Sequence, residues 1–83
     1  MEHYLIIARS ITQAQRFDST LKQAGIHSRI FRAPRDLIDL GCAYAVQIPE
    51  PTLPQALTTL HQANMSPVKI YLTREGSYQE AAL

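Results

Sequence analysis

Cys42 is the only cysteine of the chain, and it stands between the segment 34–41 and an apolar run that extends to Ile48. A single thiol cannot form an intramolecular disulfide, and it cannot supply a cysteine-rich zinc site. Any specialised role of Cys42 therefore rests on its reactivity, because the thiolate is a nucleophile. A helix N-terminus or a nearby cation favours the thiolate by lowering the pKa from its reference value of about 8.5.

Four residues of the sequence could support such a thiol. Ser10 begins a predicted helix, whose N-terminus we expect at the same end of the molecule as Cys42. Gly41 has no side chain, so a reactive sulfur or selenium atom of a partner could approach the thiol closely. Pro34 and Arg35 begin the segment before Cys42, where they could shape a docking loop or could simply end a strand and place a charge in water.

The charged residues around this segment do not all have the same sign, so they leave the sign of the local electric field open. Arg9, Arg32 and Arg35 could bring positive charge to the thiol. Asp36 and Asp39 belong to the same loop and could cancel it. The residue pattern also fits a plainer interpretation, in which Cys42 is a small buried hydrophobic residue at the start of a strand. Both interpretations of Cys42 stay open on the pattern alone.

Composition limits the classes of function. A chain of 83 residues is long enough for one domain, residues 1–83, with a single core. A formal charge of +1 does not favour nucleic-acid binding, and no apolar run approaches the roughly 20 residues that span a bilayer. We expect a cytoplasmic protein that needs no metal or organic cofactor, because the sequence has no metal-ligand cluster and no signal-peptide pattern.

Hydrophobic periodicity predicts alternating strands and helices. Apolar and β-prone runs predict strands, and apolar residues at spacings of three and four predict helices. Capping-box spacings from Ser10 to Gln13 and from Thr52 to Gln55 mark the two helix starts. The predicted elements are a strand at 3–8, a helix from Ser10 to Gly25, strands at 26–32 and 42–48, a helix from Thr52 to Asn64, and a strand at 68–73. Residues 75–83 show no pattern, and a disordered tail is one interpretation of them.

This order predicts an α+β fold, a ferredoxin-like βαββαβ sandwich with an antiparallel four-stranded sheet and two helices on one face. Right-handed crossovers place Cys42, the loop before it and the first helix start at one end of the sheet. His3 and His27 then lie at the other end, so no histidine is positioned to activate the thiol. In the third strand we expect small Ala43 and Ala45 to face the helices.

Residues along most of the chain resemble the family called putative selenium/sulfur (Se/S) carrier protein-like. The matching features are the first strand, the Ser10 helix start, the Gly25 and Ile26 turn, an Ala-Pro-Arg segment, and a cysteine before an apolar strand. This chain has Gly41 before the cysteine, where the commoner family pattern has a glycine after it, and it lacks the family's serine-rich stretch. The resemblance implies a protein that accepts sulfur or selenium on Cys42 and passes it on.

Three functions compete on this basis. The first is a carrier that a cysteine desulfurase-type donor loads and a sulfur or selenium acceptor protein unloads. The second is a non-enzymatic small-ligand or protein-interaction module that uses the open sheet face, with Cys42 merely structural. In that case the larger side chains Tyr44, Val46 and Ile48 would be covered by a second subunit of a homodimer. The third, an enzyme with a cysteine nucleophile, is disfavoured because no base is placed to activate the thiol.

Overall fold

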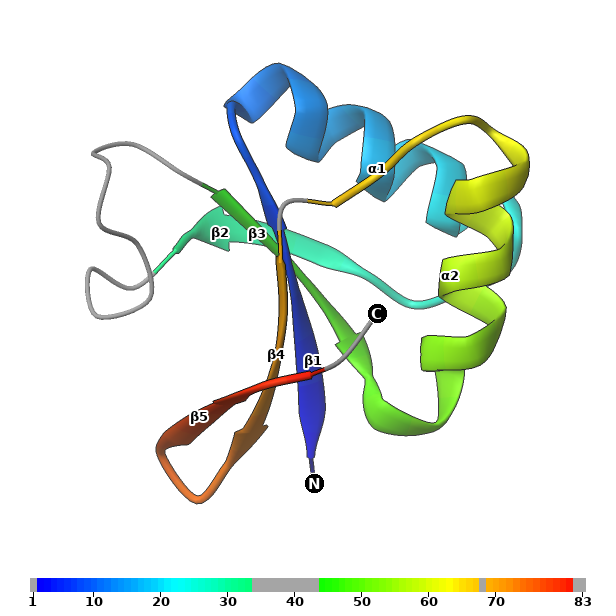
Figure 1. Cartoon of the computed structure of the whole chain (residues 1–83). Coiled ribbons are helices and arrows are strands. Elements are labelled where there is room, and N and C mark those ends of the chain that lie inside the picture. The colour runs from blue at the N-terminus through cyan, green and yellow to red at the C-terminus, as the bar shows by residue number, and fades with distance from the viewer. Residues whose placement is uncertain (1, 34–43, 68, 82–83) are drawn as a thin grey trace.

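The computed structural model describes residues 2–33, 44–67 and 69–81, and within them it forms one antiparallel sheet with two helices on one face (Figure 1). The elements are β1 (His3–Ala8), α1 (Ile11–Gln23), β2 (Arg29–Arg32), β3 (Tyr44–Pro49), a 3-10 turn η2 (Glu50–Thr52), α2 (Leu53–Gln62), β4 (Lys69–Arg74) and β5 (Ser77–Glu80). None of the helices in these ranges is long and apolar enough to cross a lipid bilayer.

The sheet has the strand order β2-β3-β1-β4-β5, with antiparallel pairing between neighbours. The first four strands of this order follow the ferredoxin-like arrangement that the sequence predicts. The predicted number of strands was wrong, because β5 adds a fifth strand at the edge beside β4. β5 lies within the stretch 75–83, in which the sequence shows no periodic pattern.

The β4–β5 hairpin combines a tight turn with an exposed second strand. Glu75 and Gly76 form a two-residue turn with φ angles of 48° and 81°. Such a hairpin turn needs left-handed backbone at both central positions, and a glycine adopts that conformation without strain. All four residues of β5 are exposed, so the strand lacks the alternation of buried and exposed residues that predicts a strand from sequence.

Helix α1 begins and ends as the sequence predicts. The Ser10 hydroxyl accepts a hydrogen bond of 3.1 Å from the Gln13 amide, and the Gln13 side chain accepts one of 2.7 Å from the Arg9 amide. Gly25 ends the helix with a φ of 82°, and the Ile26 amide donates back to the Leu21 carbonyl at 2.9 Å. These are the bonds of a glycine-terminated helix, which satisfy carbonyl groups of the last turn.

Helix α2 departs from the prediction at its start. Thr52 does not cap the helix with its side chain, and its hydroxyl donates instead to the Pro49 carbonyl at 2.7 Å. Thr52 belongs to η2 and already has helical backbone angles, so its hydroxyl bonds back to an earlier carbonyl and not to an amide of the first helical turn. Pro54 lies in that first turn, as predicted, where a missing amide proton costs little.

The second strand is shorter than predicted because its first residues have other partners. Ile26 is used in the end of α1, and the buried Ser28 hydroxyl donates to Asp18 of α1 at 2.6 Å. The strand therefore begins at Arg29. It forms one edge of the sheet.

The expected orientation of β3 was wrong. Val46 and Ile48 lie in the core between the sheet and the helices, together with Phe17 and Leu21 of α1 and Leu60 of α2. The small Ala45 lies on the opposite face, packed with Leu5, Ile7 and Ala33 under Phe31 and Tyr71. The core between the sheet and the helices is the larger of the two apolar clusters, and it contains the larger side chains of β3. The reason for expecting a second subunit over those side chains therefore disappears.

Candidate functional site

The ends of three strands meet at one end of the sheet. Tyr44, the first residue of β3, pairs with Ala8, the last residue of β1, and with Arg32, the last residue of β2. Ser10 follows β1 after one residue, Arg9, and is the N-cap of α1, which begins at this end (Figure 1). The topology thus brings together the elements that the sequence analysis expected around the cysteine.

Of the predicted site residues, the structure places Ser10. Its side chain is exposed, and its hydroxyl is engaged by the Gln13 amide as the cap of α1. Cys42, Pro34, Arg35 and Gly41 lie outside the described residues. Among the residues that are described, Ala33 and Tyr44 are their nearest neighbours along the chain.

Two arginines belong to the same end of the sheet. Arg32 lies over the ring of Tyr44, with its guanidinium carbon 6.0 Å from the ring centroid. Arg9 connects β1 to α1, and its backbone amide is held by Gln13. Both arginine side chains are exposed. They supply positive charge beside the start of β3, as the sequence analysis considered.

Exposed Ile11 is a feature of this end that periodicity did not identify. It stands three residues before Ala14, so the helical pattern places it on the same stripe as the buried Ala14 and Phe17. Its exposed fraction is nevertheless 41%, in the first turn of α1. The contact between Arg32 and Tyr44 was also missed, because it depends on the pairing of β2 with β3.

Two of the three histidines, His3 and His27, lie away from this end. His3 pairs with Pro49 of β3 and Thr73 of β4, at the opposite end of the sheet, and His27 precedes the start of β2. His61 is exposed in the last turn of α2. The topology therefore separates His3 and His27 from the first residue of β3, as the sequence predicts.

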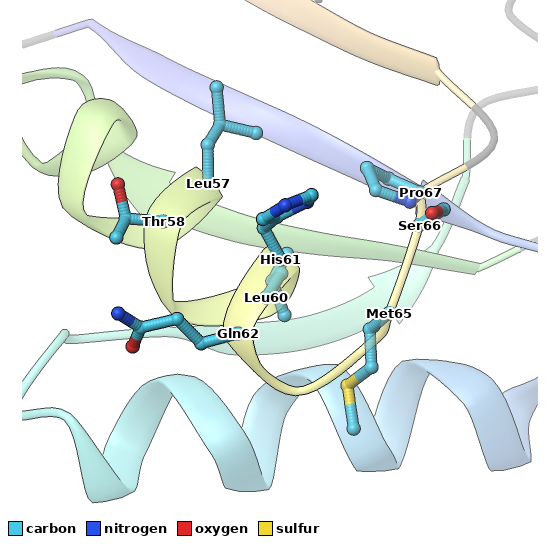
Figure 2. Close-up of a pocket in the computed structure, with 8 residues that line it drawn as sticks. All are labelled: Leu57, Thr58, Leu60, His61, Gln62, Met65, Ser66 and Pro67. Atoms are coloured by element: carbon cyan, nitrogen blue, oxygen red, sulfur yellow. The ribbon is translucent and has the colours of Figure 1, made fainter.

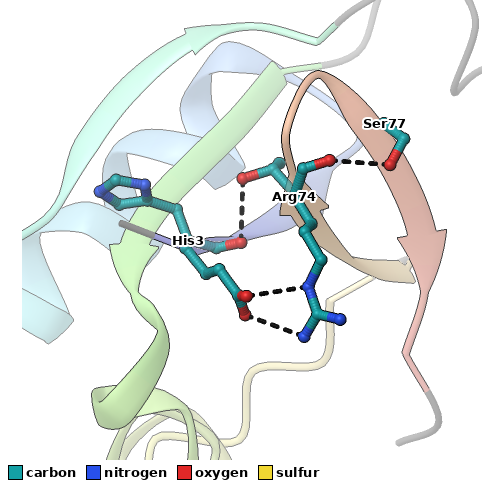
Figure 3. A network of polar contacts seen from close by, with 5 residues as sticks. His3, Arg74 and Ser77 are labelled. Atoms are coloured by element: carbon teal, nitrogen blue, oxygen red, sulfur yellow. Dashed lines mark hydrogen bonds and ion pairs between the residues drawn. The ribbon is translucent and has the colours of Figure 1, made fainter.

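An ionic cluster joins three segments at the opposite end of the sheet, and Figure 3 shows its contacts between the start of β1 and the β4–β5 hairpin. The Arg74 guanidinium contacts the two Glu2 carboxylate oxygens at 2.8 and 3.2 Å, and the Thr73 hydroxyl donates to the His3 carbonyl. A hydrogen bond with Glu50, and then Arg74, lowers the pKa of Glu2. The same bond and the Glu2 charge raise the pKa of Glu50. This cluster connects β1, η2 and the β4–β5 hairpin.

The helical layer contains an open groove of about 500 Å³ at the end of α2 (Figure 2). Leu57, Leu60, Met65 and Pro67 give it apolar walls, and His61 contributes a polar group. Met65 also lines a second hollow of about 300 Å³ along α1, and its sulfur accepts a hydrogen bond from Thr20 at 3.7 Å. Neither hollow is lined by the strand ends around Tyr44.

Comparison with known proteins supplies the family. The family model described as "Putative Se/S carrier protein-like" matches residues 3–72, which include β1 through most of β4. No significant match was found among curated proteins. The match spans well over half of the chain and agrees with the resemblance found in the sequence. The chain belongs to the Se/S carrier protein-like family.

Proposed function

We propose that this protein carries sulfur or selenium on Cys42 and delivers it to a partner protein. The observation that carries the proposal is the family match over residues 3–72, a range that contains the only cysteine of the chain. The cysteine precedes Tyr44 by two residues, so chain connectivity alone limits their Cα atoms to about 7.6 Å apart. The cations at this end of the sheet therefore belong to the neighbourhood of the proposed carrier residue.

The transfer is a thiol–persulfide exchange. In loading, the Cys42 thiolate attacks the outer sulfur of a donor persulfide. A new S–S bond forms on Cys42, the S–S bond of the donor breaks, and its electron pair leaves on the donor thiolate. In delivery, an acceptor thiolate attacks the outer sulfur of Cys42, and the Cys42 thiolate leaves. Selenium follows the same sequence, and the electrons balance without an added oxidant, metal or organic cofactor.

Positive charge favours both halves of this exchange. The reactive form of Cys42 before loading is an anion, and the group that leaves in delivery is the same anion. Arg9 and Arg32 lie at the strand ends beside the start of β3, and the N-terminus of α1 begins at Ser10. A cysteine desulfurase-type enzyme has the chemistry of the donor, and a thiol-containing acceptor protein has that of the recipient. The exchange requires a free thiol, which a reducing compartment such as the cytoplasm maintains.

The test is loading of the purified protein. The protein is incubated with a cysteine desulfurase and cysteine, and separately with a small neutral organic persulfide, and its intact mass is measured. We expect a gain of one sulfur atom on wild-type protein that a thiol reductant removes. Peptide mapping should place that sulfur on Cys42.

The controls separate transfer from adventitious sulfur. The Cys42→Ser variant has nearly the same shape and should gain no sulfur from either donor. A thiol-containing acceptor that is added afterwards should then take sulfur from the loaded wild-type protein in one turnover. Equal gain by wild type and Cys42→Ser, or no gain by wild type from either donor, would contradict the carrier function.

A further inference from the structure

We propose that the surface formed by Arg9, Ile11, Arg32 and Tyr44, here called the arginine end, docks an acidic surface patch of the protein that donates sulfur. The inference rests on the proposed carrier function and names the chemistry of its partner. The four residues come from the β1–α1 connection, the first turn of α1, the end of β2 and the start of β3. Pairing of Tyr44 with both Ala8 and Arg32 fixes these elements side by side (Figure 1).

The cations of the arginine end have no counter-ion among the residues that the structure describes. In residues 2–33, 44–67 and 69–81, neither Arg9 nor Arg32 forms an ion pair. In the same ranges Lys22, Lys69 and Arg74 form ion pairs with Asp18, Glu80 and Glu2, whereas Arg16 and Arg29 form none and lie apart from the arginine end. Exposed cations that the fold leaves uncompensated are available to a carboxylate of another protein.

The carboxylates in the described ranges lie elsewhere. Glu2, Glu50 and Glu75 are at the opposite end of the sheet, before β1, after β3 and in the β4–β5 turn. Asp18 and Glu80 are held in their own ion pairs. A molecule polarised in this way turns its arginine end toward an acidic surface during encounter.

Ile11 gives this surface an apolar anchor. In the described ranges the exposed large hydrophobic side chains are Ile11 at 41% and Tyr78 at 38%. Tyr78 of β5 pairs with Thr73 of β4, at the end of the sheet opposite the arginine end. Protein interfaces commonly combine an apolar anchor with arginines around it. Arg32 is restrained over the Tyr44 ring at 6.0 Å, which lowers the entropy that binding must remove.

These features favour a protein over a nucleic acid as the occupant. Two uncompensated arginines around an isoleucine neutralise few phosphates, and the formal charge of the whole chain is +1. An acidic patch with an apolar socket complements both the charges and Ile11. A nucleic acid is therefore the alternative occupant that the experiment tests. The partner that we assign to this surface is the protein that donates sulfur to the carrier.

The experiment measures the second-order rate of sulfur loading by a cysteine desulfurase under single-turnover conditions. The Arg9→Glu, Arg32→Glu double variant is compared with an Arg16→Glu, Arg29→Glu double variant. Arg16 and Arg29 are also exposed and lie on α1 and at the start of β2, so the two variants have the same net charge. We expect the first pair to slow loading about tenfold or more at low salt, as loss of electrostatic steering does. The control pair should stay within about twofold of wild type.

Two further comparisons isolate docking from chemistry. The Arg9→Glu, Arg32→Glu variant should lose more of its loading rate with the desulfurase than with the small neutral persulfide, because the small donor has no protein surface and reports only the effect of the two charges on the thiolate. Ile11→Ser should slow loading by the desulfurase, whereas Tyr78→Ser should not. In a titration of isotope-labelled protein with the resting desulfurase, amide signals of Arg9, Ile11 and Arg32 should shift first.

The outcomes distinguish this inference from the carrier function. Loading that is equally fast in all charge variants, or equally slowed by both pairs, overturns docking at the arginine end while Cys42 remains a carrier. Docking at the arginine end is also overturned if the small persulfide loads the protein but the desulfurase does not bind it. Shifts at the arginine end without sulfur gain from either donor support docking and contradict the carrier function. Displacement of the desulfurase by a short single-stranded RNA at equal concentration would assign the surface to nucleic acid.

Discussion

Arg32 and Tyr44 face each other across the β2–β3 pair, with the Arg32 guanidinium carbon 6.0 Å from the centre of the Tyr44 ring. Eleven residues separate the two along the chain, and they stand at the border of the segment that contains Cys42. Their contact joins the end of one strand to the start of the next. It therefore contributes to the stability of the sheet edge next to the proposed carrier residue.

Removing this contact should have a small, measurable effect. Arg32→Gln and Tyr44→Leu, with the double variant, form a thermodynamic cycle. We expect a coupling free energy of about 0.5 to 1 kcal/mol from denaturant unfolding, because the pair is partly exposed. Arg29→Gln, on the same strand and outside the pair, should show no coupling with Tyr44→Leu. A coupling indistinguishable from zero would mean that the arginine does not rest on the ring in solution.

The bond from Ser28 to Asp18 should matter more. Ser28 is 5% exposed and donates to Asp18 at 2.6 Å, while Lys22 contacts the other carboxylate oxygen at 3.0 Å. Ser28→Ala removes the donor of a charge-assisted bond, so we expect a loss of about 1 to 2 kcal/mol in the free energy of unfolding. Ser19→Ala, on an exposed position of α1, should change that free energy by less than about 0.5 kcal/mol. Equal effects of the two substitutions would refute the assigned bond.

The orientation of β3 can be tested with neighbouring residues. Ile48 is fully buried beneath the helices, whereas Gln47 is half-buried on the other face of the sheet. Ile48→Ala should reduce the free energy of unfolding by roughly 2 to 4 kcal/mol, because it leaves a cavity in the core. Gln47→Ala should cost less than about 1 kcal/mol. If Gln47→Ala were the more damaging change, the helices would cover the opposite face.

The Glu2–Glu50–Arg74 cluster predicts a pH dependence of stability. The pKa of Glu50 is raised above its ordinary value of 4.5, first by its hydrogen bond with Glu2 and then by the Glu2 charge. A raised native pKa contributes stability below the unfolded value that is lost as the pH rises through the raised one. Glu50→Gln should therefore have a higher Tm than wild type at neutral pH. The difference should shrink as the pH falls below 4.5 and Glu50 becomes protonated.

Glu2→Gln should behave in the opposite way. Hydrogen bonds with Glu50 and Arg74 lower the pKa of Glu2, so its contribution is present above 4.5 and is lost as the pH falls through the lowered value. The variant should melt below wild type at neutral pH and converge with it in acid. Both differences should decrease in 1 M salt, because the groups are partly exposed to solvent. Glu75→Gln removes a carboxylate from the same end but outside the cluster, and a similar pH trend there would show that overall charge is responsible.

The sequence by itself determined the local elements. Ser10 and Gln13 marked the start of α1, Gly25 marked its end, and the apolar run of β1 predicted a strand with the bounds that the structure has, His3–Ala8. These features are decided within a few residues by capping bonds, backbone conformation and β-propensity. The order of the elements then predicted the ferredoxin-like core and the separation of His3 from the first residue of β3. The residues around Cys42 also carried the family resemblance.

Only the tertiary structure decided which face of β3 is covered, because alternation along a strand separates two faces without saying which one meets the helices. It also added β5, whose exposed residues gain strand structure by pairing with β4 through the Glu75–Gly76 turn. Thr52 lost its expected capping role to its bond with Pro49. The arginine end has the same origin, since Arg9, Ile11, Arg32 and Tyr44 are separated in sequence and become neighbours through strand pairing. Long-range pairing and the competition for buried surface are properties of the whole fold, and no local pattern encodes them.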